Sequence, residues 1–277
     1  MLYNLLAEHN SLFNILRYIS FRSGGAVFTS LFLTLYIGPK IISWLKAKQA
    51  EGQPIRLDGP ESHLLTKKGT PTMGGLMILI SISFSTLLWS DLKNPYIWIV
   101  LFVLISFGMV GFFDDYLKLT KRNSKGLSSR KKILGQAIFS LITVLLIQAV
   151  TSPALASHIS VPFFKEVLIN AGIFYIPFVM LVMIGASNAV NMTDGLDGLA
   201  IVPIMIATGC FVLISYLIGR PDFSSYLQLN FVAGASELAV FCSALVGASL
   251  GFLWFNAQPA EVFMGDTGSL ALGGALG

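Results

Sequence analysis

Long apolar runs separated by short polar segments recur along nearly the whole chain. A helix needs about 20 mostly apolar residues to cross a bilayer. By this rule we expect transmembrane helices near 22–42, 74–90, 96–113, 133–150, 172–191, 199–218 and 238–256. An eighth apolar run begins after Gly268, but the sequence ends at Gly277, after too few residues to cross. The pattern therefore predicts an all-α, polytopic transmembrane helix bundle with seven complete spans and a truncated eighth.

No polar linker divides these runs, so we expect residues 1–277 to form a single membrane domain that is truncated at its C-terminus. Residues 1–20 have no basic leader and no small-residue cleavage site, which favours an interfacial amphipathic helix over a signal peptide. Two glycine pairs, 247 with 251 and 273 with 277, have the GxxxG spacing of closely packed transmembrane helices. We expect them to pack inside the bundle, and a homodimer is the alternative.

The composition agrees with a membrane protein. Hydrophobic residues make up 55% of the chain and charged residues 12%, which lies outside the usual range of soluble domains. Cys210 and Cys242 each lie in an apolar run without a CxxC or histidine neighbour, so we expect them to be packing residues.

The basic residues predict the orientation of the chain, because loops rich in Lys and Arg stay in the cytoplasm. They are concentrated in 43–73 and 114–132, and alternate threading places 192–198 and 257–268 on the same side. That side is therefore predicted to be cytoplasmic and the N-terminus periplasmic. This rule accounts for most of the basic excess, so we expect no nucleic-acid partner.

Five aspartates fall at the ends of predicted spans, all on the cytoplasmic side: Asp114, Asp115, Asp194, Asp197 and Asp266. A single acid at a wet helix end needs no special role. However, 192–198 and 257–268 contain no Lys or Arg, so these acids lack a local partner. Carboxylates together with phosphate oxygens are suitable ligands for Mg²⁺. This arrangement indicates a site for a metal and a phosphorylated substrate.

Nearby lysines supply the opposite charge. Lys67, Lys68 and Lys118 lie close to the span ends and suit phosphate groups as point charges. Repulsion between Asp114 and Asp115 makes one of them a candidate general base. Phosphoryl transfer depends mainly on positioning and charge neutralisation. The aspartates and lysines at these span ends are residues of the kind that this reaction needs. The chain has no GxxxxGK[ST] or GxGxxG loop, which argues against an ATP-driven machine.

Four segments together closely resemble the phospho-N-acetylmuramoyl-pentapeptide-transferase family, within the polyprenyl-phosphate N-acetylhexosamine-1-phosphate transferases. They are 67–75 (KKGTPTMGG), 111–118 (GFFDDYLK), 188–198 (NAVNMTDGLDG) and 255–269 (FNAQPAEVFMGDTGS). The resemblance covers nearly the whole chain. It implies transfer of phospho-MurNAc-pentapeptide from its UDP carrier to undecaprenyl phosphate, which gives lipid I and UMP and requires Mg²⁺. It also implies a bacterial cytoplasmic membrane and an active site on the cytoplasmic face.

The resemblance also implies roles for individual residues. Asp266 matches the magnesium ligand, and Asp114 and Asp115 match an essential catalytic pair. The positions that match the nucleotide and phosphate cleft are Lys67, Thr72, Lys118, Asn191, Asp194, Asp197, Asn256 and Phe263, with Phe263 near the uracil. Family members usually have ten spans and a histidine-rich cytoplasmic loop, and this sequence has neither the last spans nor that loop.

Two other functions remain as alternatives. A GlcNAc-1-phosphate transferase acting on the same lipid would use the same kind of site. A membrane transporter would instead need charges near the bilayer midplane at broken helices, whereas the acids of this sequence lie at one face.

Overall fold

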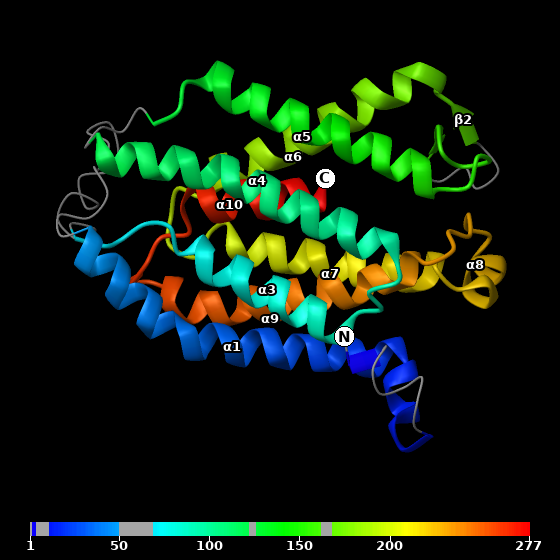
Figure 1. Cartoon of the computed structure of the whole chain (residues 1–277), viewed down its shortest axis with the longest axis horizontal. Coiled ribbons are helices and arrows are strands. Elements are labelled where there is room, and N and C mark those ends of the chain that lie inside the picture. The colour runs from blue at the N-terminus through cyan, green and yellow to red at the C-terminus, as the bar shows by residue number, and fades with distance from the viewer. Residues whose placement is uncertain (1, 4–10, 50–68, 122–125, 162–167) are drawn as a thin grey trace.

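The computed structural model describes residues 2–3, 11–49, 69–121, 126–161 and 168–277, and it is a bundle of helices (Figure 1). The principal helices are α1 (Ile19–Lys48), α3 (Gly75–Trp89), α4 (Pro95–Thr120), α5 (Ser129–Val150), α6 (Tyr175–Thr193), α7 (Ile201–Ile218), α9 (Leu238–Asn256) and α10 (Gly265–Leu276). The shorter elements are the 3-10 helices η2 (Ser11–Arg17), η3 (Gly172–Phe174) and η4 (Ala235–Glu237), the helix α8 (Pro221–Leu227), and the strands β1 (His158–Ser160) and β2 (Leu168–Asn170). The two strands pair antiparallel, with Ile159 opposite Ile169.

Each of the seven predicted spans is a helix, which confirms an all-α membrane bundle. Six helices of the described chain are long and apolar enough to cross a membrane: α1, α4, α5, α6 with η3, α7, and α9 with η4. The exception is α3, which has 15 residues. At 1.5 Å per residue it rises about 22 Å, less than the hydrocarbon core of about 30 Å. It packs against α1, α4, α9 and α10, so its length is matched to the bundle rather than to lipid.

Some predicted boundaries differ from the structure. α4 continues through Thr120, whereas the prediction ended this span at 113. Consequently Asp114, Asp115 and Lys118 lie on the last turns of a helix and not in a loop. Ion pairs between Lys118 and the two aspartates, three and four residues earlier, support these turns. The helix α8 and the β1–β2 hairpin were not predicted, because both are too short to show a hydrophobic period.

The predicted interfacial helix over 1–20 falls partly outside the described residues. Within them, Ser11–Arg17 is the 3-10 helix η2, and α1 already begins at Ile19. This part of the prediction is not tested further.

The buried centre of the bundle is α9, which lies against α1, α3 and α7, while α10 packs against α4, α6 and α3. Large side chains of α9, including Phe241, Leu245 and Phe252, are fully buried. By contrast, α5 and α6 lie at the edge (Figure 1), and only 22% and 11% of their most apolar windows are buried. Their exposed faces are apolar and suited to lipid.

The glycine pairs pack within the chain, as the sequence predicts. A Cβ on Gly247 would lie 2.1 Å from the carbonyl oxygen of Val27 in α1, and one on Gly273 would lie 2.7 Å from the carbonyl oxygen of Ala186 in α6. These glycines therefore allow α9 to approach α1 and α10 to approach α6.

A buried ion pair lies at the end of the bundle where α1 begins. Arg22 of α1 is 2% exposed and donates to Glu237 of η4 with both terminal nitrogens, at 2.6 and 2.5 Å. Glu237 also accepts from the backbone N–H of Asp91, at 3.0 Å. The pair joins α1, α9 and the turn after α3. The hydrophobic pattern gives no sign of this contact, because its two partners lie 215 residues apart.

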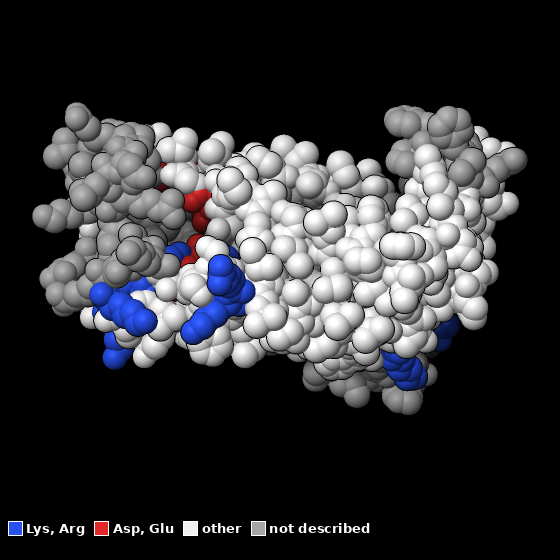
Figure 2. All heavy atoms as spheres, turned by 90° about the horizontal axis from the view of Figure 1, so that it is seen from above, with Lys and Arg blue, Asp and Glu red and all other residues white. Residues whose placement is uncertain are grey.

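The described ends of the four segments that the sequence assigned to one side lie at one end of the bundle. The C-terminal ends of α1, α4 and α6 and the N-terminal ends of α3, α5 and α10 lie there (Figure 1). Figure 2 shows acidic atoms in a recess at this end, with basic side chains around it.

Candidate active site

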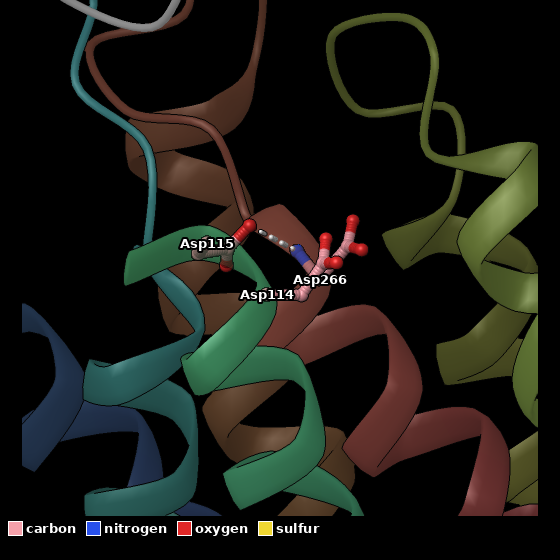
Figure 3. Close-up of side chains that lie close together, drawn as sticks. All are labelled: Asp114, Asp115 and Asp266. Atoms are coloured by element: carbon pink, nitrogen blue, oxygen red, sulfur yellow. Dashed lines mark hydrogen bonds between the residues drawn. The ribbon is translucent and has the colours of Figure 1, made fainter. Parts of the chain in front are cut away.

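Three aspartates from two helices meet at this end of the bundle. Asp114 and Asp115 come from the last turns of α4, and Asp266 comes from the first turn of α10 (Figure 3). Each offers a carboxylate oxygen, and these oxygens lie within 4.8 Å of one another. Asp114 is 3% exposed and Asp115 1% exposed. The sequence places these residues about 150 positions apart, and the packing of α10 on α4 brings them together.

Asp115 joins α4 to the beginning of α10. Its Oδ1 accepts from the backbone N–H of Asp266 at 3.2 Å. Its Oδ2 accepts from the backbone N–H and the hydroxyl of Thr267, at 2.9 and 2.8 Å. The first N–H groups of a helix have no partner within the helix, and the positive end of its dipole favours a carboxylate. Asp115 therefore caps α10, and these bonds fix its orientation.

Glycines let the helix backbones come close enough for these contacts. A Cβ on Gly111 of α4 would lie 2.0 Å from the carbonyl oxygen of Asp266. A Cβ on Gly75 of α3 would lie 2.2 Å from the backbone nitrogen of Gly268 in α10. Gly265, which starts α10, has a φ of +74°, a conformation that glycine adopts without steric cost. The site therefore depends on three closely packed helices.

Two lysines neutralise much of the acidic charge. The Nζ atom of Lys118 lies 2.5 Å from Asp114 Oδ2, 3.2 Å from Asp266 Oδ2 and 3.8 Å from Asp115 Oδ1. The Nζ atom of Lys132, from the first turn of α5, lies 2.7 Å from Asp266 Oδ2. Burial raises the pKa of Asp266, but hydrogen bonding with Asp114 and the charges of the two lysines outweigh it and hold this pKa well below its ordinary value. Asp266 is therefore ionised at neutral pH.

Lys132 is a site residue that the sequence analysis missed. It belongs to the basic segment 114–132, in which Lys118 is the only basic residue that the sequence analysis singled out. Nothing in that segment distinguishes Lys132 from its neighbours, because its side chain reaches Asp266 only when α5 packs on α4 and α6, which in turn pack on α10.

Asn191, which the resemblance assigns to the nucleotide and phosphate cleft, contacts the cluster. Its Nδ2 donates to Asp266 Oδ1 and to the hydroxyl of Ser269, both at 2.8 Å. Its Oδ1 accepts from the Nζ atom of Lys132 at 3.3 Å. Asn191 at the end of α6 thus orients both the carboxylate and the lysine.

Thr72 lies beside the aspartates. Its backbone N–H and C=O pair with the side-chain amide of Gln49 at 2.9 and 3.1 Å, and its buried hydroxyl has no hydrogen-bond partner. That hydroxyl and Asp115 Oδ2 would each lie 2.7 Å from a Cβ on Gly265. The Thr72 hydroxyl is therefore available, next to the carboxylate, for a group that enters the site.

Asn256 connects the two loops that carry the remaining predicted residues. It is 4% exposed, its Oδ1 accepts from the N–H of Gly198 at 3.0 Å, and its Nδ2 donates to the carbonyl of Val262 at 2.9 Å. This contact holds the loop of Asp194 and Asp197 against the loop of Phe263. Both polar groups of Asn256 serve this purpose in the structure, and its predicted contact with substrate is not tested. Lys67 lies outside the described residues.

The residues present suit a divalent cation. Within the described part of the chain, Asp114, Asp115 and Asp266 form a group of potential metal ligands whose oxygens are close enough to share one ion. Mg²⁺ prefers such oxygen ligands and usually takes one or two carboxylates together with water and phosphate oxygens.

Comparison with known proteins identifies the family. Residues 97–277 match the model of glycosyl transferase family 4, and residues 67–79 match signature 1 of phospho-N-acetylmuramoyl-pentapeptide-transferase. The phospho-N-acetylmuramoyl-pentapeptide-transferase of Granulibacter bethesdensis is 60% identical over 280 residues, which cover 100% of this chain and 77% of that protein. The shared signature and this full-chain identity show that the chain belongs to the phospho-N-acetylmuramoyl-pentapeptide-transferase family of membrane enzymes.

Proposed function

We propose that this enzyme transfers phospho-MurNAc-pentapeptide from UDP-MurNAc-pentapeptide to undecaprenyl phosphate, forming lipid I and UMP. The observation that carries the proposal is the cluster of three aspartates and two lysines at one end of a membrane bundle. Such a cluster suits a reaction between two phosphate esters, one of them anchored in lipid. The family membership supports the choice of sugar and lipid.

The active site is proposed to face the cytoplasm of the bacterial inner membrane. The loops at the end with the aspartates carry most of the Lys and Arg residues. Because such loops stay in the cytoplasm, the N-terminus is periplasmic. A UDP-linked substrate made in the cytoplasm reaches the site from that side, and the lipid phosphate reaches it from within the membrane.

In the proposed reaction an oxygen of undecaprenyl phosphate attacks the sugar-bound phosphorus of the nucleotide. A new P–O bond forms, the bond between that phosphorus and UMP breaks, and UMP leaves with the bonding electrons. Asp114 accepts the proton of the lipid phosphate. Lys118 and Lys132 lie where they can balance phosphate charge, since both contact Asp266. Asp115 keeps α4 and α10 in register during the transfer.

Mg²⁺ is proposed to bind at Asp266, next to Asp114 and Asp115. When bound, it supplies positive charge to the diphosphate and to the departing UMP, which is the main need of phosphoryl transfer. Lys67, Thr72, Asn191, Asp194, Asp197, Asn256 and Phe263 are proposed to line the nucleotide and phosphate cleft, with the Phe263 ring against the uracil.

UMP release from the purified protein in detergent tests this function. We expect release with UDP-MurNAc-pentapeptide and undecaprenyl phosphate, its loss on chelation and its recovery on addition of Mg²⁺. Asp266→Asn should abolish release, because it removes the ionised ligand. Asp222→Asn is the matched control, since Asp222 is exposed on α8 at the other end of the bundle.

Two outcomes would contradict the proposal. Release from UDP-GlcNAc but not from UDP-MurNAc-pentapeptide would identify a GlcNAc-1-phosphate transferase instead. A phosphosugar trapped covalently on the protein when the lipid is omitted would replace the one-step reaction by a two-step route through an aspartyl intermediate.

A further inference from the structure

The face of α5 that is buried in the bundle is mostly polar. Its buried residues are Gln136, Ser140, Thr143 and Val144, while the exposed residues of the same helix include Ile133, Leu134, Ile138 and Leu145. This is the reverse of the pattern of a helix in a soluble protein. Because lipid is as apolar as a leucine side chain, hydrophobicity alone gives α5 little preference for the bundle. Its placement therefore depends on side-chain packing, as between Phe139 and Phe102 of α4, and on polar contacts.

Gln136 makes the most extensive of these contacts. It is fully buried, its Nε2 donates to the hydroxyl of Ser187 at 3.3 Å, and its Oε1 accepts from Asn188 at 2.9 Å. The Ser187 hydroxyl in turn donates to the carbonyl of Leu270 at 3.0 Å. Gln136 thus links α5 to α6, and Ser187 links α6 to α10.

This network lies one helical turn deeper in the bundle than the active-site residues, on the same three helices α5, α6 and α10. Lys132 precedes Gln136 by four residues, Asn191 follows Ser187 by four, and Asp266 precedes Leu270 by four. Residues four apart lie on the same face of a helix. The outer layer, in which Lys132 and Asn191 contact Asp266, therefore sits directly on the inner layer of Gln136, Ser187, Asn188 and the Leu270 carbonyl.

We propose that Gln136 is a positioning residue, which places Lys132 on Asp266 by fixing α5 to α6, the helix that packs on α10. α5 also packs on α4, where Phe139 lies edge-on to Phe102. Among the described hydrogen bonds, however, only those of Gln136 and Lys132 join α5 to α6, so the loss of this bridge removes the remaining polar contacts that fix α5 relative to α6. A small shift of α5 displaces the Lys132 ammonium from its 2.7 Å contact with Asp266. The reaction then loses a positive charge at the carboxylate and phosphate site.

Site-specific acetylation of the whole protein in detergent tests the placement of Lys132 directly. Lys131 is exposed on the same turn and serves as an internal reference, whereas the Lys132 side chain is 15% exposed and ion-paired. We expect Lys132 to react more slowly than Lys131 in the wild-type protein, as measured by peptide mass spectrometry after digestion with a protease that does not cut at lysine. Gln136→Met keeps the size of the side chain but removes the bridge, and it should raise the Lys132-to-Lys131 ratio several-fold.

Gln148→Met is the matched control, because Gln148 lies at the other end of α5 and its Nε2 contacts only the loop hydroxyl of Ser157 among the described hydrogen bonds. It should leave the ratio unchanged. In the UMP assay Gln136→Met should lower kcat by about tenfold, as the loss of an outer partner of a metal or phosphate site commonly does, while Gln148→Met should not.

An unchanged acetylation ratio in Gln136→Met, an equal rise in Gln148→Met, or an unaltered kcat would each overturn the inference. If Gln136→Met does not purify as a folded protein, the double variant Ser187→Ala with Asn188→Leu replaces it, because together these changes remove both α6 partners of Gln136. The activity arm rests on the proposed function, but the acetylation arm does not. A wild-type protein that releases no UMP would therefore refute the proposed function and leave acetylation to decide the role of Gln136.

Discussion

Asp114 and Asp115 are neighbours in the sequence but have different surroundings. Asp115 accepts three hydrogen bonds from the start of α10. Asp114 accepts from the N–H of Leu127 at 2.7 Å and pairs with Lys118. Successive residues of a helix point about 100° apart, so Asp115 bonds the backbone of α10 while Asp114 bonds the backbone of the loop after α4. This difference favours Asp114 as the proton acceptor and Asp115 as the residue that holds α10 against α4.

Thr267→Val tests the structural part played by Asp115. Valine keeps the shape of threonine but removes the hydroxyl that donates to Asp115 Oδ2. We expect UMP release to fall about tenfold, which is the lower end of the effect of losing a residue that hydrogen-bonds an active-site carboxylate. Thr267→Ser should retain most activity, because serine keeps the hydroxyl. Thr208→Val is the control, since the Thr208 hydroxyl is equally buried but bonds only its own helix in α7. Equal activity of Thr267→Val and wild type would contradict this role.

At the scale of elements, the site depends on how closely α3, α4 and α10 approach one another. Gly75, Gly111 and Gly268 lie at these crossings, and side chains there would overlap backbone atoms of the neighbouring helix. Backbone cannot move aside as a flexible side chain can. The distance between α4 and α10, and with it the distance between the two aspartates of α4 and Asp266, is therefore set by the absence of Cβ atoms.

Gly111→Ala should separate α4 from α10. We expect loss of most UMP release, together with a destabilisation of about 1–3 kcal/mol, as is usual for overpacking. Gly185→Ala is the matched control, because Gly185 is also helical but has no atom within 4 Å of an added Cβ. Alanine favours helix more than glycine does, so this control should be neutral or slightly stabilising. Thermal unfolding in detergent and the UMP assay measure both effects, and full activity of Gly111→Ala would contradict the argument.

The ion pair between Arg22 and Glu237 is a second contact that joins elements, at the opposite end of the bundle. Arg22→Met should lower the free energy of unfolding by about 3–5 kcal/mol, because it leaves a buried carboxylate without its charge partner. The double variant Arg22→Met with Glu237→Leu should recover much of this loss, since no buried charge remains. Denaturant unfolding in detergent measures both. A double variant no more stable than Arg22→Met would contradict this interpretation.

At the scale of the whole molecule, the distribution of charge separates the two ends. The aspartates, Lys118 and Lys132 gather at one end. The strands β1 and β2 and the helix α8 lie at the other end (Figure 1). The ion pair of Arg22 with Glu237 lies there too, near the start of α1. A bundle with this polarity can bring a water-soluble nucleotide to one face of the membrane while its apolar sides contact lipid.

Cysteine labelling tests the orientation of the molecule. In a protein whose Cys210 and Cys242 are replaced by Ala, single cysteines are introduced as Ser225→Cys in α8 and Arg130→Cys in α5, both exposed positions. A maleimide that does not cross the inner membrane should label Ser225→Cys in cells whose outer membrane has been permeabilised and whose inner membrane is intact. It should label Arg130→Cys only after the inner membrane is also permeabilised. The reverse pattern would place the aspartate end in the periplasm.

The sequence by itself determined the fold class, the approximate position of each long helix, and the end of the bundle at which the acidic residues lie. Runs of apolar residues carry this information because their length and spacing are properties of the chain alone. It also identified Asp114, Asp115, Asp266, Asn191 and Lys118, which the structure brings into contact.

Only the tertiary structure decided which carboxylate each partner contacts. Lys132, Thr267 and Gln136 have no distinguishing pattern in the sequence, because their importance comes from helices far apart in the chain. The same holds for Arg22, whose partner Glu237 lies 215 residues away. Long-range pairing of this kind depends on how the helices cross, and a hydrophobic pattern contains no information about the crossing.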